Sequence, residues 1–275
     1  MWKEISICYI VYNEQYLLPI SLGQVVDWAQ ENEYEIIIIN GSPDGASTDN
    51  TGKVVKDFME KYPCLITYVE GTFGTHNWEE NWDKVQRNEY LKFASGDFIF
   101  QIDADEFYPK KHLYTITEEI DKDENDDITG CRFNNLHFYC DYKHYLENIG
   151  KNDNRFTKRT IGCFYDRKND TNLKDESGIT ISDSGRVLTL DKVVRFHFGH
   201  GMPWEYYKPR VAKFVKRGEE KHFDMKDYDN WKDPRSLKHP GVKVYNGEYP
   251  ELMQKAINEG NPYFKLWGEN RKNET

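Results

Sequence analysis

The sequence predicts an α/β protein with a mainly parallel sheet flanked by helices, followed by an irregular C-terminal extension. Strand-like and helix-like segments alternate between residues 5 and 102, which is typical of parallel sheets with helical crossovers. Four consecutive isoleucines at 36–39 suit a strand that is buried on both faces. A chain of 275 residues with 38% hydrophobic and 15% aromatic residues can form one large packed domain.

Each element of the first half follows from its residue pattern. Apolar, β-rich runs predict strands at residues 5–11, 36–39, 65–69 and 97–102. Apolar residues at helical spacing predict helices between these strands. Ser47 or Thr48 can cap the second helix, and Asp49 can cap or charge its start. Ligands of such sheets bind beyond the carboxyl ends of the strands. The loops that begin at Tyr12, Asn40 and Asp103 should therefore open on one edge.

Net charge and cysteine content limit the classes of protein to which this chain can belong. The net charge of −10 argues against a nucleic-acid-binding protein, which needs a basic face. Five cysteines, an odd number at irregular spacing, indicate reduced thiols and a cytoplasmic protein. Cys131, His137, Cys140 and His144 match no common zinc-finger spacing. No apolar run approaches the ~20 residues of a transmembrane helix, and we expect no transmembrane segment.

An acidic motif follows the fourth expected strand. Asp103 and Asp105 are separated by the small residue Ala104, so in an extended segment both carboxylates lie on one side and can address one centre. Carboxylate oxygens are the ligands that Mg²⁺ and Mn²⁺ prefer. The motif therefore predicts a site for a divalent metal ion.

Several segments in a fixed order resemble one family. They are Ile5-Ser6-Ile7-Cys8-Tyr9-Ile10-Val11-Tyr12-Asn13-Glu14, Ser47-Thr48-Asp49-Asn50-Thr51, Arg87-Asn88-Glu89, Ala94-Ser95-Gly96-Asp97-Phe98-Ile99 and Ile102-Asp103-Ala104-Asp105-Glu106. Together they resemble family 2 glycosyltransferases of the bacterial or viral type, which are inverting enzymes with the GT-A fold. The resemblance covers residues 5–108, and more weakly Phe196-His197-Phe198-Gly199.

The resemblance implies a donor and a metal site. It implies a nucleotide-sugar donor, with a UDP-sugar as the first choice, a glycan or other hydroxyl-bearing acceptor, and Mn²⁺ or Mg²⁺ as cofactor. Asp103, Asp105 and His197 would hold the metal. Residues expected to bind the donor are Tyr12, Glu14, Asn40 or Asp44, Arg87 and Asp103.

The resemblance also implies a division of the chain. Residues 1–215 would form the GT-A domain, with a nucleotide-binding half at 1–108 and an acceptor half at 109–215, and residues 216–275 a C-terminal extension packed on it. The second strand ends in Asn40-Gly41, where the family usually has adjacent acidic residues. The Gln-x-x-Arg-Trp signature of processive synthases is absent, which predicts addition of a single sugar.

Inversion requires a base that accepts the proton of the attacking hydroxyl. Asp141 is the first choice because it follows a strand-like run, and Glu205 and Glu147 are the alternatives. A sugar-phosphate nucleotidyltransferase is the competing enzyme, but its basic, glycine-rich loop is missing after the first strand. A catalytically inactive nucleotide-sugar-binding module is the competing non-enzyme, although Asp103 and Asp105 are both present.

Overall fold

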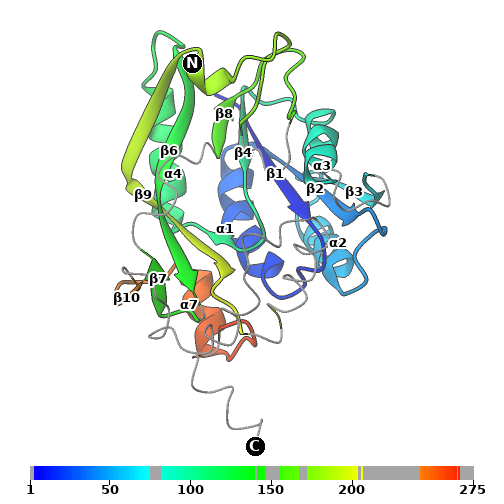
Figure 1. Cartoon of the computed structure of the whole chain (residues 1–275), viewed down its shortest axis with the longest axis vertical. Helices are drawn as coiled ribbons and strands as arrows, with labels where there is room; N and C mark the ends of the chain where they lie inside the picture. Colours follow the sequence, from blue (N-terminus) through cyan, green and yellow to red (C-terminus); the bar gives the residue numbers. More distant parts are fainter. Residues whose placement is uncertain are drawn as a thin grey trace, which may run out of the picture.

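The computed structural model describes residues 3–74, 82–139, 141–146, 155–166, 172–203, 206, 242–264 and 266. Ten strands form one sheet (Figure 1), namely β1 Ile5–Val11, β2 Glu35–Ser42, β3 Ile66–Thr72, β4 Phe98–Gln101, β5 Glu106–Phe107, β6 Ile128–Tyr139, β7 His144–Leu146, β8 Phe156–Lys158, β9 Arg186–His200 and β10 Val242–Val244. The helices are α1 Leu18–Glu31, α2 Thr51–Lys61, α3 Trp82–Leu91, α4 Lys110–Asp121 and α7 Glu251–Asn258, with a short 3₁₀ turn at Ile181–Asp183.

The half of the sheet formed by the first four strands of the chain is parallel, as the sequence predicts. Its strands lie in the order β3-β2-β1-β4, and each neighbouring pair is parallel. Beyond β4 the sheet continues with β8, β6, β7 and β10, which pair antiparallel. The long strand β9 runs parallel to β6 and carries β5 on its other edge. The predicted mainly parallel sheet flanked by helices is therefore confirmed, with an antiparallel part added.

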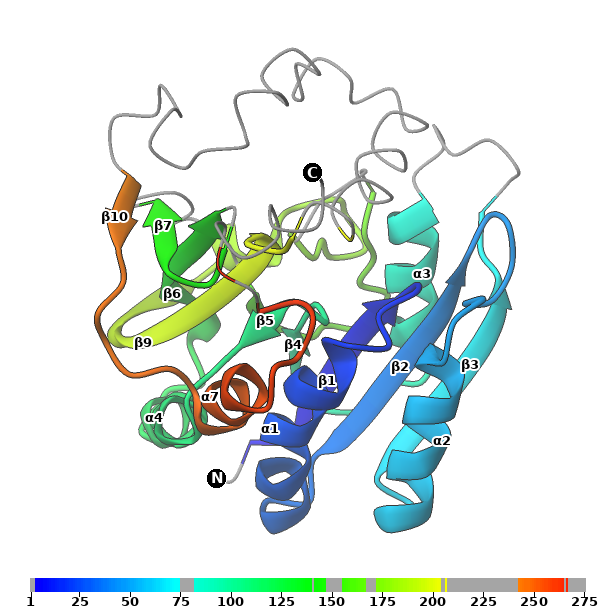
Figure 2. The ribbon, with the colours of Figure 1, turned by 90° about the horizontal axis from the view of Figure 1, so that it is seen from below.

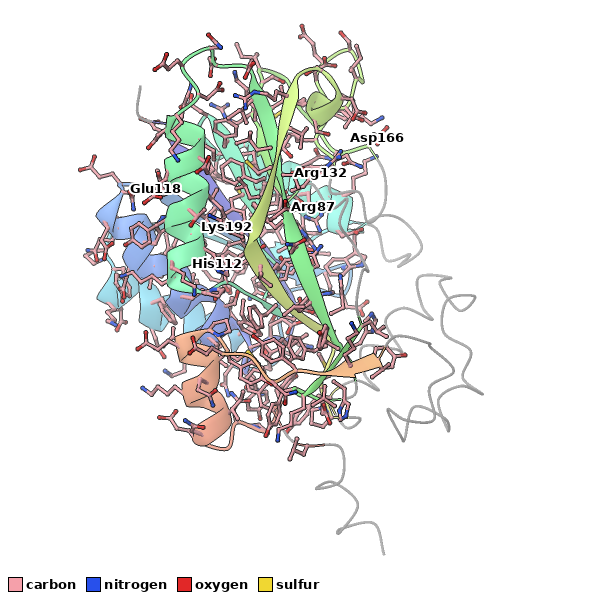
Figure 3. The ribbon with its side chains drawn as sticks, turned by 90° about the vertical axis from the view of Figure 1, so that its left-hand side faces the viewer. Arg87, His112, Glu118, Arg132, Asp166 and Lys192 are labelled. Atoms are coloured by element: carbon pink, nitrogen blue, oxygen red, sulfur yellow. The ribbon has the colours of Figure 1, made fainter. Side chains whose placement is uncertain are left out.

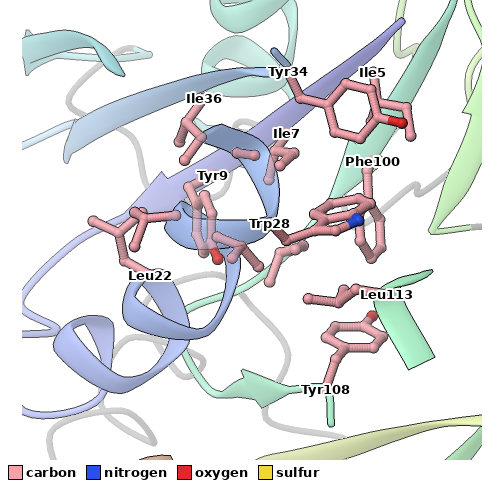
Figure 4. Packing of buried hydrophobic residues seen from close by; sticks show 14 of the residues in the cluster. Ile5, Ile7, Tyr9, Leu22, Trp28, Tyr34, Ile36, Phe100, Tyr108 and Leu113 are labelled. Atoms are coloured by element: carbon pink, nitrogen blue, oxygen red, sulfur yellow. The ribbon is translucent and has the colours of Figure 1, made fainter. Parts of the chain in front are cut away.

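Alternating residues of the parallel strands build two cores. Ile36 and Ile38 face one core, which contains side chains of α1, α2 and α4, whereas Ile37 and Ile39 face the other core, beneath α3. Figure 2 shows α1, α2 and α4 on one side of the sheet and α3 on the other. Figure 4 shows the first core, where Trp28 packs edge-on against Phe100. Burial on both faces explains why the isoleucine run at 36–39 is uninterrupted.

Two details differ from the sequence prediction. The second helix begins at Thr51, and of the expected residues at its start Asp49, not Ser47 or Thr48, accepts the Thr51 N–H, at 2.9 Å. Strand β2 continues past the isoleucine run at 36–39, through Asn40 and Gly41, to Ser42. It can do so because Gly41 has no side chain, since a Cβ there would lie only 2.1 Å from the carbonyl oxygen of Gly71 on β3.

A third core joins the end of the chain to the strands of the second half. It lies around Phe107, Phe138 and Phe198, and Met253 and Phe264 from the C-terminal part pack into it. Strand β9 is also bonded to α4, because the N–H of Val194 donates to Nδ1 of His112, at 3.1 Å. Figure 3 shows α4 with His112 lying beside the long strands. The expected domain boundary at residue 215 lies outside the described residues.

Candidate active site

The three expected loops meet at the carboxyl edge of the parallel strands. The loop after β1 is bonded to the segment that precedes α2. The N–H of Asn13 donates to Ser47 Oγ at 2.8 Å, and Asn13 Oδ1 accepts the N–H of Thr48 at 2.8 Å. The N–H of Glu14 donates to Thr51 Oγ1 at 2.7 Å. Strand β4 pairs in parallel with β1, which brings the acidic motif to the same edge.

The residues expected to bind the donor differ in exposure. Tyr12 is half-buried, and its ring packs edge-on against Trp82 at 6.5 Å between centroids. Asp44 is exposed in the turn after β2, whereas Glu14 is buried. Asn40 is 1% exposed, and its Nδ2 donates to Tyr68 Oη at 2.7 Å while its Oδ1 accepts the Ser47 hydroxyl. The buried Asn40 amide therefore links the loop after β2, through Ser47, to Tyr68 on β3.

Two arginines face the first aspartate of the motif. Nη2 of Arg155 lies 2.8 Å from Oδ2 of Asp103, and Nη2 of Arg87 lies 3.9 Å from its Oδ1. Burial opposes ionisation of Asp103, but the Arg155 and Arg87 guanidinium groups outweigh it and lower its pKa. Asp103 keeps 27% of its side chain exposed, so this charged group is accessible to a ligand.

The second aspartate of the motif faces a histidine. Asp105 is 3% exposed, and its Oδ1 lies 3.8 Å from Nε2 of His197 on β9. The N–H of Phe198 donates to the Asp105 carbonyl at 2.8 Å, which fixes β9 against the motif. The structure thus brings the expected metal residues Asp105 and His197 together, and Asp103 lies close enough for both of them to influence its pKa.

Burial makes His197 a neutral side chain. Burial, followed by His137 and Arg195, lowers the pKa of His197 well below its usual value. Nδ1 of His197 lies 2.7 Å from Nδ1 of His137 on β6. A neutral imidazole whose Nε2 lies near a carboxylate can share a metal ion with that carboxylate.

Asp105 and His197 fit a divalent ion whose coordination is completed by substrate oxygens. Among the residues that the structure describes, no group of three or more His, Cys, Asp or Glu side chains is arranged to hold a metal ion. Mg²⁺ and Mn²⁺, however, are commonly held by one or two protein ligands plus substrate phosphates. Space beside Asp105 and His197 is kept by Gly199, because a Cβ there would lie 2.8 Å from His197 Nε2 and 3.4 Å from Asp105 Oδ2.

Three buried charged residues of this site were not predicted from the sequence. Glu106 accepts from Arg155 at 2.6 Å and from Arg195 at 3.0 Å. Burial raises the pKa of Glu106 to about 7, although both arginines act to lower it. Arg195 could have been found, because strand alternation puts it on the same face as His197. Arg155 carries no such signal, since its surroundings in the sequence are polar and irregular.

The expected bases are placed less favourably. The Asp141 carboxylate is buried in a turn, where its Oδ1 accepts the N–H groups of Lys143 and His144 at 2.8 and 2.9 Å and lies 2.9 Å from His144 Nδ1. Glu205 and Glu147 lie outside the described residues.

No helix within the described part of the chain is both long and apolar enough to cross a membrane.

Comparisons with known proteins identify the family. The family model of glycosyl transferase family 2 matches residues 6–172, more than half of the chain, and the chain belongs to this family. A poly(ribitol-phosphate) beta-glucosyltransferase of Bacillus spizizenii is 28% identical over 124 residues, which are 44% of this chain and 18% of that protein. The chain therefore spans only about a fifth of the length of this curated relative.

Solved structures of TarS from S. aureus are also similar. TarS 1–349 in complex with UDP is 21% identical, with a TM-score of 0.37, over 48% of this chain and 36% of that one. TarS 1–349 without a named ligand is 14% identical, with a TM-score of 0.47, over 93% of this chain and 78% of that one.

Proposed function

We propose that this protein transfers a single sugar from a nucleotide-sugar donor to a hydroxyl-bearing acceptor, with inversion and with the help of Mn²⁺ or Mg²⁺. The observation that carries the proposal is the pair of Asp105 and His197, 3.8 Å apart at the carboxyl edge of the sheet. Membership of glycosyltransferase family 2 supports glycosyl transfer. UDP-sugars are the first donors to test, and a glycan or another polyol is the acceptor class.

The proposed donor site consists of charges that match a diphosphate. When bound, the divalent ion would be held by Asp105 and His197 and would neutralise the negative charge that develops on the leaving diphosphate. Arg87 and Arg155 keep the Asp103 carboxylate ionised and fixed at the same edge. Tyr12 lies on the first loop, where its ring can stack on the nucleobase.

The acceptor hydroxyl attacks the anomeric carbon, the bond to the diphosphate breaks, and the hydroxyl proton passes to a base. Asp141 and Glu205 remain the proposed bases. Asp141 also stabilises its turn through the N–H groups of Lys143 and His144, so its replacement affects folding as well as transfer. Glu205→Gln tests the second base separately, because a base variant should bind donor normally and lose transfer.

A panel of nucleotide sugars tests this function. The protein is incubated with each donor and Mn²⁺, and release of nucleoside diphosphate is followed, because transferases slowly hydrolyse their donor without an acceptor. Donor-selective release that falls about a thousandfold in Asp105→Asn, a change of about 4 kcal/mol in the barrier, supports transfer. Formation of inorganic diphosphate from a nucleoside triphosphate and a sugar phosphate would instead identify a nucleotidyltransferase. Binding of a donor without any release would identify an inactive binding module.

A further inference from the structure

His137 and His197 form a direct pair across two parallel strands. They are partners in the register of β6 and β9, so their Cα atoms lie side by side. Their rings are nearly perpendicular, at 87°, with centroids 4.8 Å apart. The shortest contact joins the two Nδ1 atoms, at 2.7 Å. This distance is that of a hydrogen bond between two ring nitrogens.

Such a contact holds a single proton. Two bare nitrogens would set one lone pair against another, and two N–H groups would set one proton against another. One ring must therefore donate through Nδ1 and the other must accept through Nδ1. Which ring donates decides what His197 presents at its other nitrogen, because a neutral imidazole carries only one proton.

The surroundings of His197 Nε2 select between the two arrangements. Nε2 lies 3.8 Å from Oδ1 of Asp105, and Gly199 leaves the adjoining space open. A lone pair on Nε2 can bind a metal ion together with Asp105, whereas a proton on Nε2 cannot. We propose that His137 is a positioning residue, which accepts the Nδ1 proton of His197 and so keeps the Nε2 lone pair directed at the metal site. This inference rests on the proposed function.

The proposed role of His137 is one that hydrogen-bond partners of metal-binding histidines commonly have, although the partner is usually not a second histidine. Histidines that bind metals donate their other N–H to a carboxylate, a carbonyl or water, and removal of that partner typically lowers metal affinity 10- to 100-fold. Here the partner is a second imidazole, held by the strand β6. Phe138 directly follows His137 on β6, and Phe198 directly follows His197 on β9. Their rings stack with centroids 4.2 Å apart in the third core and fix both backbones. Because side chains alternate along a strand, the two histidines then lie together on the opposite face.

Two substitutions separate the acceptor atom from the bulk of the ring. His137→Phe keeps an aromatic ring and puts a C–H in place of Nδ1. His137→Asn keeps an acceptor oxygen close to the former position of Nδ1. The dissociation constant for Mn²⁺ is measured at one pH from the electron paramagnetic resonance signal of free Mn²⁺, with and without UDP. Asp105→Asn serves as the control for the metal site itself.

We expect His137→Phe to bind Mn²⁺ about 10- to 100-fold more weakly than the parent, and His137→Asn to stay within about threefold. Parent-like affinity in His137→Phe overturns the inference, and so does an equal loss in both variants, since volume rather than the acceptor would then matter. If Asp105→Asn also binds Mn²⁺ like the parent, the proposed metal site is wrong. A loss in Asp105→Asn alone leaves the metal site standing and removes only the role of His137.

A spectroscopic measurement keeps the test decisive if His137→Phe does not fold. In metal-free parent protein labelled with ¹⁵N-histidine, the ring nitrogen shifts report which nitrogen carries the proton. The His197 signals are assigned by their loss in His197→Asn, among the eight histidines of the chain. We expect the proton of His197 on Nδ1 and none on Nε2. A proton on Nε2 of His197 contradicts the inference.

Discussion

Gly199 lies over the two atoms that we propose as metal ligands. Because its Cβ would come within 2.8 Å of His197 Nε2 and 3.4 Å of Asp105 Oδ2, Gly199→Ala should crowd the metal position from one side. We expect Mn²⁺ affinity and sugar transfer to fall about tenfold or more in this variant, a loss of about 1.4 kcal/mol. Mn²⁺ titration and donor hydrolysis measure the two effects.

Gly71→Ala is the matched control for this substitution. A Cβ at residue 71 would meet nothing within 4 Å, so the same chemical change should leave Mn²⁺ affinity unaltered. If Gly199→Ala binds Mn²⁺ as tightly as Gly71→Ala does, the metal ion does not lie between Asp105 and His197.

Single residues of the site were predictable where a local pattern marks them. Asp103 and Asp105 stand out because a buried strand ends directly before them, and His197 stands out through the residues that follow it. Arg155 reaches Asp103 from 52 positions along the chain, through the antiparallel pairing of β8 with β4. No local pattern encodes that contact, because it depends on the tertiary arrangement.

The first residue of α2 anchors the loop that carries Tyr12. Thr51 is fully buried, and its hydroxyl accepts the N–H of Glu14 at 2.7 Å. Thr51→Val keeps the shape of the side chain but leaves this buried N–H without its acceptor, which costs about 1–3 kcal/mol. We expect faster hydrogen–deuterium exchange at residues 12–17 and a lower free energy of unfolding.

Thr51→Ser retains the hydroxyl and should retain the slow exchange of this loop, although it loses one methyl group. Equal exchange at residues 12–17 in Thr51→Val and the parent would show that the hydroxyl does not hold the loop. This measurement does not depend on any assigned ligand.

The turn between α4 and β6 is held by an ion pair with a defined pH dependence. Asp126 lies between Lys158 and Lys3, which lower its pKa to about 2. A lowered carboxylate pKa adds stability above the unfolded value, and this stability is lost as the pH falls through about 4 towards 2. Asparagine is compatible with the positive φ of Asp126, so Asp126→Asn tests the charge alone. Because the Asp126 side chain is 58% exposed, this substitution should lower the free energy of unfolding by only about 1 kcal/mol at pH 7.

Urea unfolding of Asp126→Asn and the parent at pH 7, 5 and 3 measures this dependence. The difference in unfolding free energy should shrink at the lowest pH, because the carboxylate of the unfolded chain, whose pKa is not lowered, then takes up a proton. A difference that is constant from pH 7 to pH 3 would rule out the ion pair as its cause.

The elements of the first half could be predicted, and those of the second half largely could not. Strand and helix periods are local, and they located β1, β2, β4 and their helices within a few residues. The parallel pairing of β6 with β9 joins residues about 60 positions apart, and its register shifts interrupt the simple alternation of side chains. Such pairings depend on the whole sheet rather than on one segment.

The C-terminal part of the chain shares its core with the strands that carry the site. Met253 on α7 is fully buried in the third core, with Phe107, Phe138 and Phe198. Met253→Ala should therefore destabilise the whole protein by about 2–5 kcal/mol. We expect one cooperative transition in calorimetry, shifted to lower temperature, rather than a separate early transition of the C-terminal part.

Lys255→Ala is the control on the same helix, because the Lys255 side chain is 66% exposed and its loss should change stability by less than about 0.5 kcal/mol. Two transitions in Met253→Ala would instead indicate that the expected extension at 216–275 unfolds as an independent unit.

In the proposed function this chain binds a nucleoside diphosphate through a metal ion held by Asp105. Calorimetric titration of UDP into the parent and into Asp105→Asn, each in Mn²⁺ and in excess EDTA, measures the contribution of that ion. We expect Mn²⁺ to tighten UDP binding to the parent by about tenfold or more, and Asp105→Asn to remove this gain. Equal UDP affinity of the parent in Mn²⁺ and in EDTA would show that no metal ion joins the nucleotide to Asp105.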